Sequence, residues 1–104
     1  MKKYNVYITG RAFSDLRIRI GYLRNVQKSM QAAQALYDDY RETKTVLANI
    51  AGALADPDNE KLRRRGLKRI NFLHHNYFML FRVEMEKVFI VRVFHGLEDY
   101  QNKL

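Results

Sequence analysis

The sequence predicts an α+β fold: an N-terminal strand, a helical hairpin, and then a three-stranded antiparallel meander that completes one small antiparallel sheet. Two observations lead to this prediction. Apolar residues recur with a period of two at the start and end of the chain and every three to four residues between them. A chain of 104 residues is also long enough for one core but not for two. We therefore expect residues 1–104 to form a single domain with the helices packed on one face of the sheet.

The first half of the chain predicts one strand and two helices. Residues 4–9 alternate β-branched and aromatic side chains, which is typical of a strand. Thr9 or Ser14 could cap the helix that follows, and the helical spacing of apolar residues continues beyond Ser29 into a second helix. No Gly or Pro marks the turn, so the position of the break is left open between residues 25 and 31. Asp-Pro-Asp-Asn at residues 56–59 ends the second helix.

The second half predicts three strands, at residues 70–73, 77–83 and 88–94. The last of these is apolar on both faces except at Arg92, a pattern that indicates a central, covered strand. Residues 74–76 and 84–87 are the expected turns. Tyr77 and Tyr100 are the tyrosines that we expect to be exposed.

Positive charge is concentrated just before these strands. Residues 61–69 carry six Lys and Arg side chains and no acidic one, while residues 31–60 have a net charge of −4. Clustered cations attract phosphate and acidic proteins, although such a run can also be a solvated face. We expect the acidic segment to face away from an anionic partner. The residues expected to contact that partner are Lys61, Arg63, Arg64, Arg65, Lys68, Arg69 and Tyr77.

The composition also argues against several classes of function. The absence of cysteine excludes disulfides, a thiolate nucleophile and a zinc knuckle, and it fits a reducing cytoplasm. No apolar run approaches the length of a membrane span. His74 and His75 are adjacent on a turn with no nearby carboxylate, so we expect no metal site. The sequence has no Gly-rich phosphate loop, and we expect no cofactor.

Several short patterns occur in a characteristic order along the chain. Asp-Leu at residues 15–16 is followed by Tyr22; Arg69 precedes Phe72; and the final strand ends in Arg-Val-Phe-His-Gly at residues 92–96. With Ala12, Tyr77 and the Phe81-Arg82 pair, this order resembles the RelE/ParE toxins of bacterial type II toxin–antitoxin systems, and more closely the ParE-like branch. The resemblance implies a cytoplasmic, growth-arresting toxin and a tightly bound antitoxin, in a complex that can assemble further.

The resemblance leaves two activities open. RelE-like toxins cleave ribosome-bound mRNA, whereas ParE-like toxins poison DNA gyrase without chemistry of their own. Of the four cations that the RelE pattern expects, Arg69 is kept, and Asn71, Phe78 and Glu98 replace the others. Gyrase poisoning is therefore preferred to mRNA cleavage, and an inactive member that only binds its antitoxin is a third alternative.

If the chain is a ribonuclease, catalysis must rest on His95 as general base, with Arg69, Arg82 and Tyr100. The alternative role for His95 is to cap its strand by a hydrogen bond to a backbone carbonyl. Charge complementarity and the apolar stripe of the two helices predict that the antitoxin lays an acidic, partly helical segment across the sheet and the helical hairpin and covers part of residues 61–69.

Overall fold

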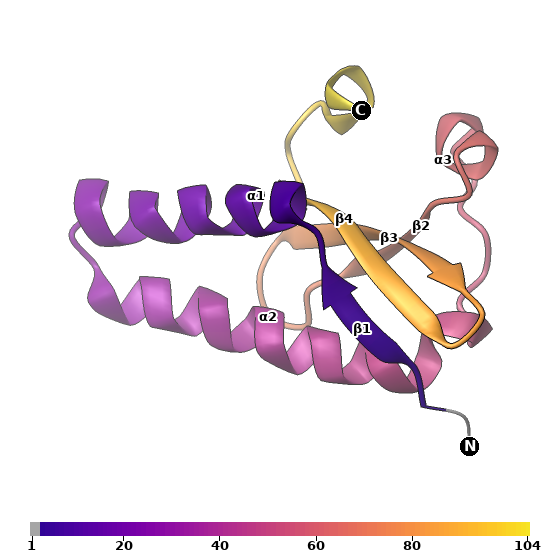
Figure 1. The fold of residues 1–104 in the computed structure, drawn as a ribbon. Helices are drawn as coiled ribbons and strands as arrows, with labels where there is room; N and C mark the ends of the chain where they lie inside the picture. The colour runs from indigo at the N-terminus through magenta and orange to yellow at the C-terminus, as the bar shows by residue number, and fades with distance from the viewer. Residues whose placement is uncertain (1–2) are drawn as a thin grey trace.

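A computed structural model describes residues 3–104. Two long helices lie side by side against one face of a four-stranded sheet, and the connection between them projects beyond the sheet (Figure 1). Among residues 3–104, no helix is both long enough and apolar enough to cross a membrane. The elements are, in chain order, β1 (Asn5–Ile8), α1 (Gly10–Gly21), α2 (Met30–Ile50), α3 (Glu60–Arg64), β2 (Lys68–Asn71), β3 (Tyr77–Glu84) and β4 (Lys87–His95).

The strand order is β1-β4-β3-β2, which places β4 inside the sheet as predicted. β2, β3 and β4 form the predicted antiparallel meander, whereas β1 pairs parallel with β4, so the sheet is mixed and the prediction of an antiparallel sheet is wrong in this respect. Parallel neighbours require a long crossover connection, and the helical hairpin and the meander together supply it. The α+β class and the order of its elements are confirmed.

Side-chain caps and one irregular turn define the helical hairpin. Thr9 Oγ1 accepts a hydrogen bond from the Ala12 N–H, and Ser29 Oγ accepts one from the Ala32 N–H, so these residues cap α1 and α2. Ser14, the other candidate cap, lies inside α1. The break left open in the sequence is a π-helical turn at Tyr22–Val26 followed by Lys28 with a φ of 57°. The chain therefore reverses there without Gly or Pro.

The two faces of the sheet are covered differently. One face packs on α1 and α2 through a core that includes Leu16, Leu36 and Phe81. The opposite face, which we call the open face, is covered in part by α3 and by residues 96–104, which we call the C-terminal tail. Leu62 of α3 is buried there against a cluster of sheet side chains that includes Phe78 and Phe94. Residues on the open face therefore alternate along the strands with residues of the main core.

Two boundaries differ from the prediction around the basic run. Its first residues form α3, which Asn59 caps by accepting a hydrogen bond from the Leu62 N–H. β2 spans Lys68–Asn71, so it begins and ends two residues earlier than the predicted strand at residues 70–73. The strand stops early because the Leu73 N–H donates to the Asp39 side chain on α2 instead of to a neighbouring strand. A contact between distant segments thus sets this boundary.

Candidate functional site: the cationic open face

Backbone carbonyls hold three cations of the basic run in place. Arg63 donates to the carbonyls of Pro57 and Asp58 at 3.0 and 2.6 Å. Lys61 donates to the Gln101 carbonyl of the tail at 2.5 Å, and Lys68 donates to the Leu54 carbonyl at 2.7 Å in the same way. A carbonyl has no net charge, so these contacts fix the side chains without neutralising them.

Arg64, the last residue of α3, and Arg65, which follows it, differ in their contacts. Arg64 forms an exposed ion pair with Glu60 at 2.8 Å. Arg65 is exposed, and within residues 3–104 it makes no hydrogen bond or ion pair. The run predicted from the sequence therefore presents a largely uncompensated positive surface, in which Arg64 alone is paired with a carboxylate among the described residues 3–104.

Arg69 and Tyr100 come together beside this run. The Arg69 guanidinium carbon lies 3.8 Å from the centre of the Phe78 ring and 5.9 Å from that of the Tyr100 ring. Arg69 Nε also donates to Asn71 Oδ1 at 3.0 Å. Arg69, Asn71 and Tyr100 line a pocket of about 340 Å³ together with Asn59 and the loop before α3. Such a cation, held over an aromatic ring, can meet an anion or a flat aromatic ligand.

Arg82 lies further along β3 on the same face. Its guanidinium carbon is 4.8 Å from the centre of the Phe89 ring, and its Nε donates to Glu84 at 3.1 Å. The Tyr7 ring of β1 stacks on the same Phe89 ring, with 5.6 Å between the ring centres. The open face thus carries cation–aromatic clusters around Arg69 and around Arg82, in addition to Arg92, whose guanidinium carbon lies 4.5 Å from the centre of the Phe94 ring.

His95 belongs to the opposite face. Its ring contacts Tyr77 edge-on with 5.0 Å between ring centres, and Tyr77 packs against the main core. The His95 Nδ1 accepts a hydrogen bond from the Leu97 N–H at 3.1 Å. Because that nitrogen is the acceptor, a neutral ring carries its proton on Nε2 and has no second lone pair to offer. The ring therefore holds the end of β4, although through an N–H donor and not through the carbonyl that the sequence suggested.

Neither tyrosine expected to be exposed is so. Tyr77 is half-buried between Phe72 and His95, and burial raises the pKa of its hydroxyl, with the Arg19 charge lowering it in part. Tyr100 is half-buried against Phe78, with 5.1 Å between ring centres. Tyrosines that are more exposed are Tyr7, Tyr22 and Tyr37. The alternation along a strand could not show which face the tail would cover.

Two patterns that carry the sequence resemblance meet at one ion pair. The Asp15 carboxylate accepts hydrogen bonds from Arg92 Nε at 2.8 Å and Nη2 at 3.3 Å, and from the Val93 N–H at 3.0 Å. These contacts join α1 to β4. Asp15 and Arg92 therefore stabilise the packing of α1 on the sheet.

Glu98, which occupies a position where RelE-like toxins would have a cation, is also built into the fold. It binds the Arg19 and Lys103 side chains and accepts a hydrogen bond from the His95 N–H. Burial alone raises the pKa of Glu98, but the hydrogen bonds from Lys103 and His95 and the Arg19 charge outweigh it, so the pKa lies below its ordinary value. The Glu98 carboxylate thus connects α1, the end of β4 and the C-terminal tail.

The buried carboxylate of Asp39 organises the loop between β2 and β3. It accepts hydrogen bonds from the Leu73 and His74 N–H groups, and its Oδ2 lies 2.6 Å from His75 Nδ1. Burial raises the pKa of Asp39, but the hydrogen bonds from His75 and His74 outweigh it and the net pKa is lowered. Part of the acidic middle segment thus points inward, contrary to the expectation of an outward acidic face.

The expectation that no carboxylate lies near the two histidines is also wrong. Asp39 reaches His75, and Glu42 Oε2 lies 3.1 Å from His74 Nε2. The available signal was helical spacing, because Asp39 lies three residues after Leu36 and next to Tyr40, which places it on the buried side of α2. Within residues 3–104, no group of three or more His, Cys, Asp or Glu side chains is placed to hold a metal ion.

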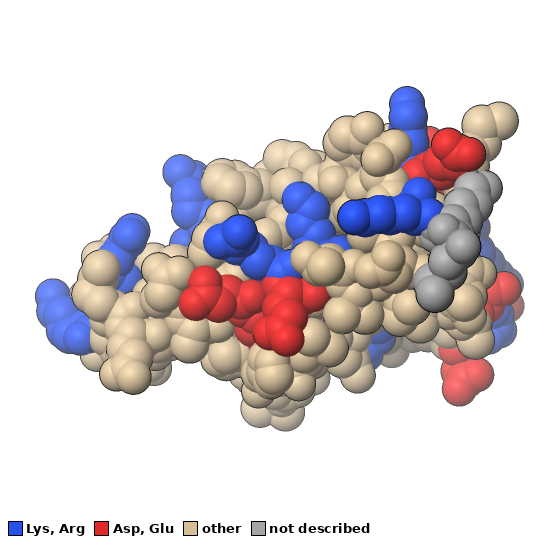
Figure 2. Space-filling model, turned by 90° about the horizontal axis from the view of Figure 1, so that it is seen from below, with Lys and Arg blue, Asp and Glu red and all other residues tan. Residues whose placement is uncertain are grey.

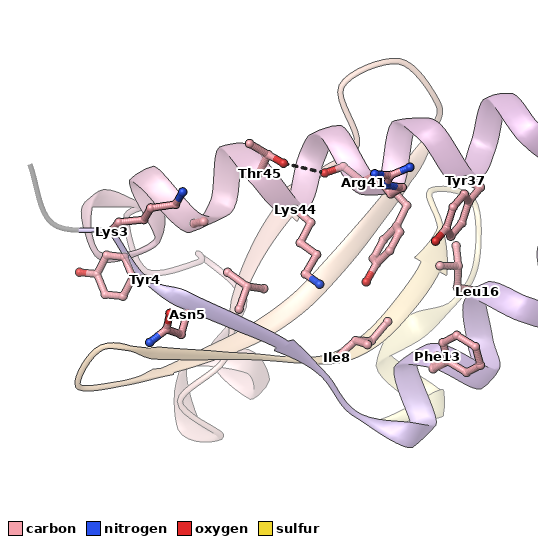
Figure 3. A pocket seen from close by; sticks show the side chains of 13 residues that line it. Lys3, Tyr4, Asn5, Ile8, Phe13, Leu16, Tyr37, Arg41, Lys44 and Thr45 are labelled. Carbon is pink, nitrogen blue, oxygen red and sulfur yellow. Dashed lines mark hydrogen bonds between the residues drawn. The ribbon is translucent and has the colours of Figure 1, made fainter.

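A second hollow, a groove of about 540 Å³, lies between β1 and the helices α1 and α2, away from the open face. β1 is an edge strand, so one side of its backbone faces this groove. Figure 3 shows Phe13 of α1 and Tyr37 of α2 on its walls, with Lys44 projecting from α2 toward β1. Arg41 also lines the groove. The sequence stripe indicated an amphipathic hairpin but could not show that an edge strand would lie beside it.

Comparison with known proteins gives one informative result. No protein-family model matches the sequence, and no curated protein matches it. The structure is similar to a chain of the chromosomal ParDE TA (toxin–antitoxin) system from P. aeruginosa, with a TM-score of 0.65 and 21% sequence identity over 89% of this chain and 96% of that chain. The chain therefore has the fold of a component of a ParDE toxin–antitoxin system, which is the fold that the sequence resemblance predicted.

Proposed function

We propose that this chain is the growth-arresting toxin of a type II toxin–antitoxin pair and that it poisons DNA gyrase. In this proposal residues 1–104 act as one toxin domain in the cytoplasm. The ParE-like sequence patterns and the ParDE-like fold support the assignment. The observation that carries the choice of mechanism is the separation of His95 from Arg69, Arg82 and Tyr100 by the thickness of the sheet.

Cleavage of RNA by its 2′-hydroxyl requires a general base, a source of positive charge and a general acid around one phosphate. The open face offers Arg69 and Tyr100 at one pocket, and the Nδ1 lone pair of His95 is already used by Leu97. The face is thus better suited to binding than to proton transfer. Cleavage of ribosome-bound mRNA is the second candidate, favoured only by the pocket in which Arg69 and Tyr100 meet.

The groove beside β1 is the proposed antitoxin site. An edge strand accepts an added strand, and the apolar side chains of Phe13 and Tyr37 suit an amphipathic segment. Arg41 and Lys44 would attract acidic residues of that segment. Residues 61–69 lie across the sheet from the helices, so an antitoxin that covers both surfaces would have to pass around an edge of the sheet.

Inducible expression in a bacterial host tests this function. We expect the wild-type chain to stop growth, co-expression of the antitoxin to restore it, and primer extension to find cellular messages intact. Unchanged growth would instead support the inactive, antitoxin-binding alternative. Codon-dependent cuts in messages would show that the chain is an endoribonuclease.

A further inference from the structure

The tip of the helical hairpin carries an exposed apolar stripe. Ile18, Tyr22 and Val26 are 64%, 50% and 63% exposed. They follow one another at spacings of four residues, so they share one side of α1 and the π-helical turn. The opposite side of the same helix holds Leu16 and Ile20 against the core. Three large apolar side chains in a row on a solvent face mark an interaction site more often than isolated ones do.

Unpaired positive charges surround this stripe. The chain contains no acidic residue between Asp15 and Asp38. Arg17, Arg24 and Lys28 are exposed, and each lacks a hydrogen bond or ion pair within residues 3–104. In Figure 2 the projecting left end of the molecule shows Lys and Arg side chains without Asp or Glu beside them. Two such tips would repel each other, whereas an acidic surface would neutralise the charge.

The backbone of the tip is irregular where regular structure was available. The Tyr22–Val26 segment forms a π-helical turn, a feature that is frequent at functional sites. Lys28 has a φ of 57°, a conformation that Gly or Asn adopts more readily. Lys28 therefore places a cation at the apex of the hairpin in a backbone conformation that costs free energy for a residue other than Gly.

From these three features we propose that the hairpin tip docks an acidic surface, with an apolar centre, on the toxin's target. The inference rests on the proposed function, which makes DNA gyrase that target. The stripe of Ile18, Tyr22 and Val26 faces away from the core, whereas the groove proposed for the antitoxin opens beside β1. The tip stays accessible because it projects beyond the sheet (Figure 1). Target docking and antitoxin binding are therefore separable by substitution.

The test compares purified wild-type toxin with the double variant Tyr22→Gln/Val26→Gln in a gyrase supercoiling assay. Glutamine keeps the helix propensity of this segment while removing the apolar contact. We expect the concentration for half-inhibition to rise at least about tenfold, since every 1.4 kcal/mol of lost contact is a factor of ten. The affinity for purified antitoxin and the midpoint of thermal unfolding should stay at wild-type values. Met85→Ser, at a side chain that is 91% exposed on the β3–β4 turn, is the matched control and should inhibit normally.

A charge variant sharpens the result. Arg17→Glu/Arg24→Glu, with Lys28→Asn to suit the left-handed backbone, should weaken inhibition most at low salt. Wild-type inhibition that the tip variants retain would overturn the docking site and leave the gyrase proposal intact. Absence of inhibition by wild type would overturn both. If the tip variants lost affinity for the antitoxin as much as they lost inhibition of gyrase, the docking site would also be overturned. The same holds if they lost binding to anionic phosphatidylglycerol vesicles but still inhibited gyrase as wild type does.

Discussion

The inward-facing carboxylates and the open-face cations of this chain have opposite tasks. Asp15 and Asp39 are tucked between elements, and each accepts hydrogen bonds from residues far away in the sequence. Arg69 and Arg82 lie over aromatic rings on the open face, and Arg65 is free in solvent within the described residues. These two carboxylates therefore join distant segments of the fold, Asp15 with Arg92 as its partner, while the cations of the open face and of the basic run are left available for a binding partner.

The physical reason lies in solvation. A carboxylate between packed elements loses water and must be compensated by several donors, so it becomes a fixed joint. A guanidinium over a ring or against a carbonyl keeps its charge and much of its contact with water. Substitutions at the first kind of site should therefore change stability, and those at the second kind should change binding.

The largest loss of stability is expected for Asp39→Ala. It removes the acceptor for the Leu73 and His74 N–H groups and for the His75 ring. We expect a loss of about 3 kcal/mol in the free energy of unfolding, measured by urea denaturation. Asp38→Ala, on the exposed side of α2, is the control and should cost little. Equal effects of the two substitutions would contradict a structural role for Asp39.

A smaller loss is expected for Asp15→Asn. The amide keeps the shape of the side chain but removes the charge that faces Arg92, which should cost about 2 kcal/mol. Hydrogen exchange at α1 and β4 should increase together, since the pair joins these two elements. Arg11→Gln is a suitable control, because Arg11 reaches Asp15 only at 3.9 Å and is exposed.

Acid should weaken the fold through the same carboxylates. The pKa values of Asp39 and Glu98 are lowered in the folded protein, so their stabilisation is present above the unfolded-state pKa of about 4 and is lost as the pH falls through the lower folded-state values. Thermal unfolding between pH 3 and pH 7 should show this decline. Glu98→Gln should make the decline shallower, and an unchanged slope would argue against this origin.

Charge reversal in the basic run should have the smallest effect on stability. For Arg63→Glu/Arg64→Glu/Arg65→Glu we expect a change near 0.5 kcal/mol, since these side chains are exposed. Association with the acidic antitoxin should slow and lose much of its salt dependence. Stopped-flow measurement at several salt concentrations checks both. Association rates that match wild type at low salt would identify the run as a solvated face only.

The order of elements was accessible from the sequence because it depends on local spacing. The change from helical to strand period, Thr9 as one of two candidate caps of α1, and the covered pattern of β4 follow from neighbouring residues alone. The cap of α2 at Ser29 was not predicted, because no Gly or Pro marks the turn before it. The parallel pairing of β1 with β4 and the early end of β2 at Asn71 could not be predicted in this way, because contacts between distant segments decide both.

The candidate site was predicted in composition but not in arrangement. Clustered cations and aromatic residues were visible in the chain, and Arg69 and Tyr100 do lie together. The separation of His95 from them depends on a β-bulge between β3 and β4 and on where the tail folds, neither of which has a sequence signal. The role of each of these residues stays a prediction.

The most direct test of the central claim compares the His95→Ala variant with the wild-type chain in three measurements. These are growth arrest on expression, inhibition of gyrase supercoiling by the purified protein, and primer extension on cellular messages. If the toxin poisons gyrase through binding alone, this variant should stop growth and inhibit supercoiling as wild type does, and cellular messages should stay intact. A general base contributes roughly 10²–10⁴-fold to a reaction. Codon-dependent cleavage by wild type that falls by about this factor in His95→Ala, with normal supercoiling, would contradict the account.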